Sequence, residues 1–241
     1  MGTGGSDAGA KVGASAVSIE SVGVGGFANT VLRAGNVALS ANVYDLASAT
    51  LGATSLTLGN VRVAGTAGFD VTNTVVTDAA FQDSLDVVAT AANGKLTFAN
   101  PARLAAGATG AVTLTAATAG VLDATVAVGL TSNANGLAGL TNVGLAGQSV
   151  AVTGAAYDFA QPTVAATLAL GNVRARSAGS LAVTNAVVTD AAFQDSLDVT
   201  ATTAVANLAV TAPGNILAGQ TRAVGVAIGR ASCRERVCQY V

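Results

Sequence analysis

One stretch decides the fold, Val75-Val76-Thr77-Asp78-Ala79-Ala80-Phe81-Gln82-Asp83-Ser84-Leu85-Asp86-Val87, because it recurs without change at residues 187–199. The offset between the two copies is 112 residues (187 minus 75). A fixed internal period is the mark of an array of similar units. The sequence therefore predicts tandem copies of one module with a period of about 112 residues.

Further landmarks recur with nearly the same spacing and set the unit boundaries. Tyr44-Asp45 matches Tyr157-Asp158 at an offset of 113 (157 minus 44), and Gly59-Asn60-Val61-Arg62 matches Gly171-Asn172-Val173-Arg174 at 112 (171 minus 59). Residues 16–21 resemble 127–132, and 37–40 resemble 150–153. The matches predict the C-terminal strands of a preceding repeat (1–43), a complete repeat (44–156), an incomplete repeat (157–227) and a tail (228–241). The chain is thus expected to be truncated at both ends.

Apolar and polar residues alternate along the complete repeat, which is the two-residue period of β-strands. The core-facing positions are predicted to be Phe69, Val71, Leu85, Val87, Val112, Leu114, Leu122, Ala124, Val126, Val128, Val150 and Val152. Roughly seven short strands in about 110 residues are typical of an immunoglobulin-like β-sandwich. The expected fold class is therefore all-β, as tandem immunoglobulin-like sandwiches. The rival is a parallel β-helix, but no sub-period of about 20 to 25 residues is found.

Composition argues against several classes of protein. Charged residues make up 10% of the chain and the net charge is −2, whereas nucleic-acid binding needs a clustered basic face. No apolar run approaches the roughly 18 to 20 residues that span a bilayer, and residues 1–6 do not read as a secretory signal. The absence of His excludes Ser-His-Asp and Cys-His catalysis. We therefore expect no enzyme activity, no catalytic, cofactor-binding or metal-binding residue, and no cofactor.

One set of carboxylates invites a functional interpretation: Asp78, Asp83 and Asp86, repeated as Asp190, Asp195 and Asp198. Carboxylates spaced along a loop can hold Ca²⁺. Calcium loops usually carry more carboxylates and a Gly at the tight turn, however, and neither is present. We instead expect Asp78 to start a turn, and Asp83 and Asp86 to lie on the solvated face of the next strand.

The remaining polar candidates are given structural interpretations. Asn60, Asn172, Asn73 and Asn185 are interpreted as turn or bulge residues. Tyr44 and Tyr157 stand at the unit boundaries, where each is expected to pack between repeats with its hydroxyl in water.

Three motifs resemble a known family. They are Leu58-Gly59-Asn60-Val61-Arg62-Val63, Phe69-Asp70-Val71-Thr72-Asn73-Thr74 and Gln148-Ser149-Val150-Ala151-Val152-Thr153-Gly154-Ala155-Ala156-Tyr157. Together they are similar to the choice-of-anchor D family of bacterial proteins. The resemblance implies immunoglobulin-like, ASH-type sandwich repeats in a secreted or cell-surface protein whose C-terminal anchor varies. This chain lacks the second Gly of the family's Arg-Val-Gly motif, and Ala64 and Arg176 stand near that place, which puts the local turn in doubt.

The last fourteen residues depart from the repeat. By the 112-residue spacing, 228–241 should resemble the alternating strand at 116–129, but they carry both cysteines, Cys233 and Cys238. Residues 228–237 also match the translation of a widely used sequencing adapter. We interpret the tail as derived from an adapter, and the alternative is a genuine redox-active terminus. Two cysteines alone are weak evidence for a metal site, which usually needs four ligands.

These expectations predict a non-catalytic stalk or spacer of a secreted or cell-surface protein, with its neighbouring repeats as partners. The alternative is an adhesin-type ligand-binding domain that uses residues 78–86 and their copy 190–198. The incomplete repeat should expose open sheet edges, and residues 1–43 are the segment that it lacks. Self-association through those edges is therefore expected.

Overall fold

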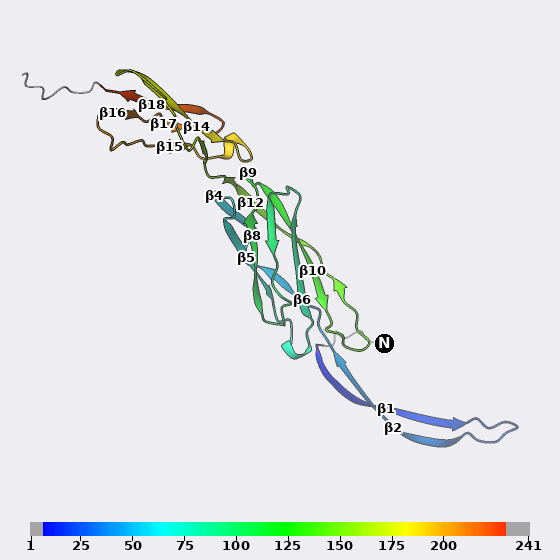
Figure 1. Ribbon diagram of the computed structural model, residues 1–241. Helices are drawn as coiled ribbons and strands as arrows, with labels where there is room; N and C mark the ends of the chain where they lie inside the picture. Colours follow the sequence, from blue (N-terminus) through cyan, green and yellow to red (C-terminus); the bar gives the residue numbers. More distant parts are fainter. Residues whose placement is uncertain (1–6, 230–241) are drawn as a thin grey trace, which may run out of the picture.

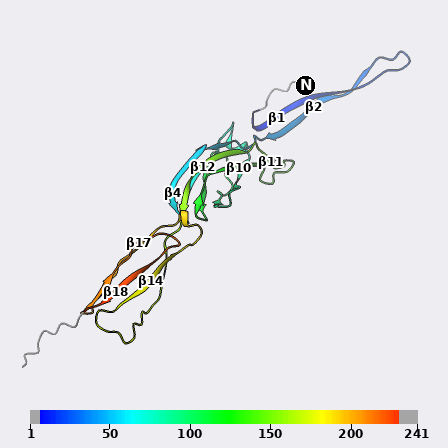
Figure 2. The same ribbon diagram turned by 90° about the horizontal axis from the view of Figure 1, so that it is seen from above.

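The computed structural model describes residues 7–229, which are almost entirely β-structure. Its strands form three bodies in a row (Figure 1), and the perpendicular view in Figure 2 shows the same order. The first body is a long hairpin of β1 (Gly9–Ser21) and β2 (Thr30–Val43). The second, which we call the central sandwich, contains β3 to β12, and the third, the C-terminal sheets, contains β13 to β18. The predicted all-β fold class is confirmed.

The central sandwich has two sheets that face each other. One sheet has the order β3 (Ala49–Leu51), β5 (Thr66–Asn73), β8 (Thr109–Ala116), β7 (Leu96–Ala99). The other has the order β11 (Val143–Gly144), β10 (Ala124–Asn133), β12 (Gln148–Tyr157), β4 (Ser55–Arg62), with β6 (Ser84–Ala91) on β10 and β9 (Gly120–Val121) on β12. All pairs are antiparallel except β12 with β4. The paired, facing sheets exclude the β-helix alternative.

The core of the central sandwich follows the alternation in the sequence. All the predicted core positions are buried except Ala124, which is half-buried. Seven strands have four residues or more, as expected, and three shorter ones, β3, β9 and β11, were not anticipated. The predicted run from Leu122 to Val128 is interrupted, because β9 ends at Val121 and β10 begins at Ala124.

The C-terminal sheets contain fewer strands and a much smaller core. A four-stranded sheet has the order β13 (Gln161–Val164), β14 (Ala178–Ala186), β18 (Thr221–Ile228), β16 (Leu208–Thr211), and β15 (Leu197–Val199) pairs with β17 (Gly214–Ile216). Among the described residues, its buried cluster consists of Val183, Ile216 and Val224. Single 3₁₀ turns, η1 (Ala79–Phe81) and η2 (Ala191–Phe193), precede β6 and β15.

The two β-rich bodies share their strand registers. Phe69 pairs with Val112 in β5–β8, and Leu181 pairs with Val224 in β14–β18, each displaced by 112 (181 minus 69, 224 minus 112). Within residues 7–229, however, the C-terminal sheets have no counterpart of β10 or β12. Ile228 still belongs to β18, and residues 230–241, with Cys233 and Cys238, lie outside the described residues. Within the described part, no helix is long and apolar enough to cross a membrane.

Candidate functional site at the junction

The repeated Asp loop is the first place where the sequence points to function, and its first carboxylate has a structural role. Asp78 caps η1, because its Oδ1 accepts a hydrogen bond from the Ala80 backbone N–H at 2.9 Å. Asp190 caps η2 in the same way, accepting from Ala192 N at 2.9 Å. The prediction that Asp78 starts a turn agrees with this geometry. Capping of this kind satisfies backbone donors that the short helix leaves unpaired.

Asp83 does not lie on the solvated face, so that prediction was wrong. Its side chain is buried at 4% exposure and precedes β6 rather than belonging to it. The Ser132 hydroxyl donates to Asp83 Oδ2 at 2.8 Å, and the same hydroxyl accepts from the Ala47 N–H at 2.9 Å. Ser132 lies 49 residues away on β10, so the local pattern could not reveal this partner.

Asp86 faces outward, as expected, and forms an ion pair. Arg103 Nε donates to its Oδ1 at 2.8 Å, and Asn133 Nδ2 donates to its Oδ2 at 2.6 Å. The hydrogen bond from Arg103 lowers the pKa of Asp86 below its ordinary value, against the opposing effect of burial; Asn133 adds to the lowering. The three carboxylates thus have three separate sets of partners. No group of three metal-ligating side chains occurs in residues 7–229.

A buried amide network beside this loop was missed by sequence reasoning. Asn73, interpreted as a turn or bulge residue, is instead the fully buried last residue of β5. Its Nδ2 donates to the carbonyls of Asp83 (3.0 Å) and Leu104 (3.2 Å), and its Oδ1 accepts from Gln82 Nε2 (3.0 Å) and Ser48 N (3.1 Å). All the hydrogen-bonding capacity of this amide is therefore used.

The same network recurs around Asn185, which lies within β14 rather than in a turn or bulge. It donates to the carbonyls of Asp195 and Ile216 and accepts from Gln194 Nε2 and Gln161 N. The signal available in the sequence was the repetition of Asn and Gln at identical spacing. Asn60, by contrast, follows a real irregularity, because Gly59 has φ +63° and the β4–β12 register shifts there.

Tyr44 and Tyr157 each begin a junction between bodies. The ring centroids of Tyr157 and Phe193 lie 5.6 Å apart, and those of Tyr44 and Phe81 lie 5.5 Å apart. Backbone bonds join the same segments: Asp158 N donates to Phe193 O at 2.9 Å, and Asp195 N donates to Asp158 O at 3.0 Å. Asp45 makes the matching pair of bonds, donating to Phe81 O and accepting from Asp83 N.

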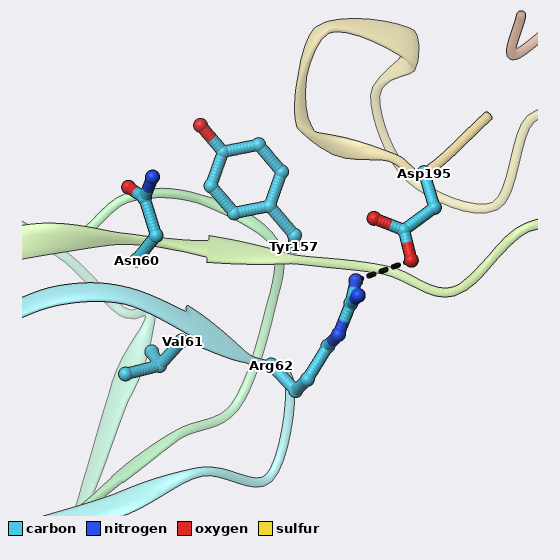
Figure 3. Close-up of a pocket in the computed structure, with 5 residues that line it drawn as sticks. All are labelled: Asn60, Val61, Arg62, Tyr157 and Asp195. Atoms are coloured by element: carbon cyan, nitrogen blue, oxygen red, sulfur yellow. Dashed lines mark ion pairs between the residues drawn. The ribbon is translucent and has the colours of Figure 1, made fainter.

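The junction at Tyr157, between the central sandwich and the C-terminal sheets, also contains an open hollow of about 380 Å³. Its lining residues are Asn60, Val61, Arg62, Tyr157 and Asp195 (Figure 3). Arg62, at the end of β4, reaches across to Asp195 with its Nη1 2.5 Å from Oδ2. Its guanidinium also lies 4.7 Å from the centre of the Phe159 ring. The hydrogen bond to Asp195 raises the pKa of Arg62 above its ordinary value. The Asp195 carboxylate thus pairs with Arg62, whereas the carboxylate of its counterpart Asp83 accepts a hydrogen bond from Ser132.

The residues at this junction are arranged to hold the two bodies together, and those that line the hollow do not form a catalytic arrangement. The two charged residues that line the hollow, Arg62 and Asp195, neutralise each other, and both side chains are partly exposed, at 46% and 34%. None of the five residues that line the hollow is a nucleophile beside a base, which covalent catalysis requires. The arrangement can hold two bodies in a fixed relation, since a π-stacked and ion-paired Arg has little freedom to rotate.

The chain matches no protein-family model and no curated protein. Similar solved structures include domains 1–6 of the surface layer protein SbsC, with 16% identity and a TM-score of 0.28 over 74% of this chain and 20% of that one. The S-layer protein rSbsC has 15% identity and a TM-score of 0.30 over 80% and 23%. The secreted serine protease VesC from Vibrio cholerae has 13% identity and a TM-score of 0.24 over 73% and 45%.

This chain therefore spans less than half the length of each of these proteins. At TM-scores of 0.30 or below, neither a shared fold nor a shared function follows for this chain. The resemblance to choice-of-anchor D proteins stays an expectation, because no family model matches.

Proposed function

We propose that this chain is a non-catalytic structural module, a stalk or spacer of a secreted or cell-surface protein. The observation that carries the proposal is the junction between the central sandwich and the C-terminal sheets. Only residues 158–160 separate β12 from β13. Backbone bonds on both sides of Asp158, the Tyr157–Phe193 contact and the Arg62–Asp195 ion pair fix this short link. A stalk needs such links, since domains joined by small interfaces otherwise move freely.

A second line of support is that the conspicuous polar side chains are used internally. Asp78 and Asp190 cap 3₁₀ turns, Asp83 is buried, and Asn73 and Asn185 bond backbone groups. Side chains engaged in this way stabilise the module: Asp83, Asn73 and Asn185 are buried, and Asp78 and Asp190, which stay exposed, each use one carboxylate oxygen in the cap. The adhesin alternative therefore has less support, because its proposed contact loop has few unengaged carboxylates.

The surface location rests on the motif resemblance alone. Residues 58–63, 69–74 and 148–157 are similar to choice-of-anchor D proteins, and we extend that family's secreted or cell-surface location to this chain. Fractionation of the source cells, with an antibody against the central sandwich, tests the location. Recovery only from the cytoplasm would contradict it without touching the structural role.

The structural role is tested by small-angle X-ray scattering of matched variants at low concentration. Arg62→Ala should broaden the distribution of end-to-end distances, because the junction loses its ion pair and its contact with Phe159. Arg174→Ala is the matched control, since Arg174 is the counterpart of Arg62 (174 minus 112) and has no ion pair in residues 7–229. A wild-type chain already as flexible as Arg62→Ala would contradict the stalk.

The adhesin alternative is tested by binding of the same protein to immobilised glycans and matrix proteins. Saturable binding that disappears in Asp78→Ala/Asp190→Ala, while the circular dichroism spectrum is retained, would replace the stalk with a ligand-binding domain. Absence of binding across the panel is the expected result.

A further inference from the structure

Two Asn-Gly pairs occur in the sequence, Asn93-Gly94 and Asn135-Gly136, and their surroundings differ. Glycine has no side chain, so its backbone nitrogen reaches the Cγ of a preceding asparagine with the least steric hindrance. Attack at that carbon expels ammonia and closes a five-membered succinimide ring. Each pair is therefore a candidate for spontaneous deamidation, and the contacts of each asparagine decide which one reacts.

The first asparagine is held by backbone groups in a short link. Asn93 is half-buried and lies in the connection between β6 and β7, residues 92–95. Its Oδ1 accepts from the Lys95 N–H at 3.1 Å, and its Nδ2 donates to the Leu122 carbonyl at 3.1 Å. Ring closure would break both bonds and would distort a link that has little length to absorb the change. We therefore expect this asparagine to react slowly.

The second asparagine lies in a longer and more open segment. Asn135 is exposed and belongs to the loop between β10 and β11, residues 134–142. Its φ is 54°, in the left-handed region that costs an L-residue energy, and Gly136 follows with φ 75°. A loop of this length can rearrange around a new ring more readily than residues 92–95 can. Relief of the left-handed conformation favours that rearrangement.

A cation also contacts the amide of Asn135. Arg103 Nη1 donates to its Oδ1 at 3.2 Å, and its Nδ2 donates to Ser84 Oγ at 2.9 Å. Because a guanidinium can only donate, the amide oxygen must face Arg103. When the Gly136 nitrogen attacks Cγ, negative charge develops on that oxygen, and a positively charged donor stabilises it. The bond from Arg103 Nε to Asp86, at 2.8 Å, holds the guanidinium in place.

We propose that Asn135 is a site of spontaneous deamidation that Arg103 activates. Hydroxide from the solvent removes the proton of the Gly136 N–H, and this nitrogen forms a bond to Cγ of Asn135. The Cγ–Nδ2 bond then breaks, and Nδ2 takes a proton and leaves as ammonia. The Ser84 hydroxyl, which is already bonded to Nδ2, can supply that proton and recover one from water. Water finally opens the ring at either carbonyl, which leaves aspartate or isoaspartate at position 135.

The product differs from the original chain in charge and in loop length. The formal net charge changes from −2 to −3 (−2 minus 1). The new carboxylate lies beside Arg103 and competes with Asp86 for it, while the Ser84 hydroxyl can donate to the new oxygen. Isoaspartate also adds one main-chain atom to residues 134–142. This inference concerns covalent chemistry and does not depend on the proposed stalk role.

The test compares the two sites within one molecule. Full-length protein is incubated at mildly alkaline pH, digested with trypsin and mapped by mass spectrometry with fragmentation. Asn135 should deamidate at least about fivefold faster than Asn93 in the folded protein. In guanidinium chloride the two rates should agree, because both asparagines precede glycine. Equal rates in the folded protein, or a faster reaction at Asn93, overturn the proposal.

A variant tests the part played by the cation. Arg103→Gln should slow the reaction at Asn135 about three- to fivefold, because the developing charge on Oδ1 loses its positive partner. The rate at Asn93 should not change. Arg222→Gln is the matched control, since Arg222 lies on β18 in the C-terminal sheets. An unchanged or increased rate at Asn135 in Arg103→Gln, with the circular dichroism spectrum retained, overturns the role of Arg103. If that variant does not fold, the comparison of folded and denatured wild type still decides whether the structure selects Asn135.

Discussion

The thirteen residues 75–87 and 187–199 are identical and form the same capped 3₁₀ turn, yet the strands that follow the turn differ. In the central sandwich Leu85 is 0% exposed and starts the buried face of β6, which runs for eight residues. In the C-terminal sheets Leu197 is half-buried and β15 runs for three. The difference lies in the partner, because β6 pairs with β10 along its whole length, while within residues 7–229 β15 pairs only with β17. The shared residues therefore start a long core strand only where another strand pairs with them along their length.

A second pair of nearly identical segments, residues 55–62 and 167–174, also differs in structure. Their sequences, Ser-Leu-Thr-Leu-Gly-Asn-Val-Arg and Thr-Leu-Ala-Leu-Gly-Asn-Val-Arg, differ at two positions. The first is strand β4, paired in parallel with β12, and the second is not a strand. Strand propensity thus reports how well a segment suits a sheet, and the neighbouring strand decides the outcome.

The largest expected effect is a difference in stability loss when the same leucine is truncated in each of the identical stretches. Leu85→Ala should destabilise the chain by about 2–5 kcal/mol, because it leaves a cavity in a closed core. Leu197→Ala should cost about 1 kcal/mol or less when measured on the monomer, since that side chain already contacts water. Urea unfolding followed by circular dichroism, at concentrations below the onset of association, compares the two. Equal losses would show that the C-terminal sheets are as closed as the central sandwich.

The second effect concerns a feature that the two bodies share. Asn73→Ala and Asn185→Ala should each destabilise their own body by about 2–3 kcal/mol, because each leaves buried carbonyl and N–H groups unpaired. Hydrogen exchange resolves the two bodies, and protection should fall around β5 in one variant and around β14 in the other. A neutral Asn185→Ala would mean that the amide network depends on the covering sheet and is not local.

A smaller effect follows from the pKa of Asp86, which Arg103 lowers below its ordinary value. Ion pairing of this kind adds stability above the unfolded pKa of about 3.9, and the stability is lost as the pH falls through the folded value. Asp86→Asn should therefore be less stable than wild type at pH 7 and equal to it at strongly acidic pH. Asp198→Asn is the control, because the counterpart of Arg103 is uncharged Asn215 (103 plus 112). A difference that persists in acid would assign the loss to Asn133 instead.

The smallest effect tests the turn that departs from the family motif. Ala64 and Arg176 have φ of 70° and 71°, in the left-handed region that favours Gly. Ala64→Gly should raise stability by about 0.5–1 kcal/mol, since relief of this conformation exceeds the added entropy of the unfolded chain. Ala111→Gly, on extended β8, should lower stability by a similar amount. Thermal unfolding ranks the two, and a loss in both would show that the turn at Ala64 is unstrained.

The alternating pattern was enough to predict the strands and most of the central core, because burial along a strand has a period of two. It predicted Val71, Leu114 and Val150 as core residues, and all three are fully buried. It could not predict that Asp83 is buried, since the Ser132 hydroxyl that accommodates its carboxylate comes from a distant strand. Nor could it predict the Arg62–Asp195 pair, because that contact joins two bodies and exists only once the link at residues 158–160 is folded.

The parallel pairing of β4 with β12 has a mechanical consequence. The chain enters the central sandwich after β2 and leaves it at the end of β12, at opposite ends of that body (Figure 1). Tension along the molecule pulls β4 toward the entry and β12 toward the exit, so the two strands are drawn past each other. Their pairs, from Ser55 with Ala151 to Arg62 with Tyr157, must then yield together rather than one at a time. Shear of this kind makes the module resist stretching along its own axis far better than peeling from one end.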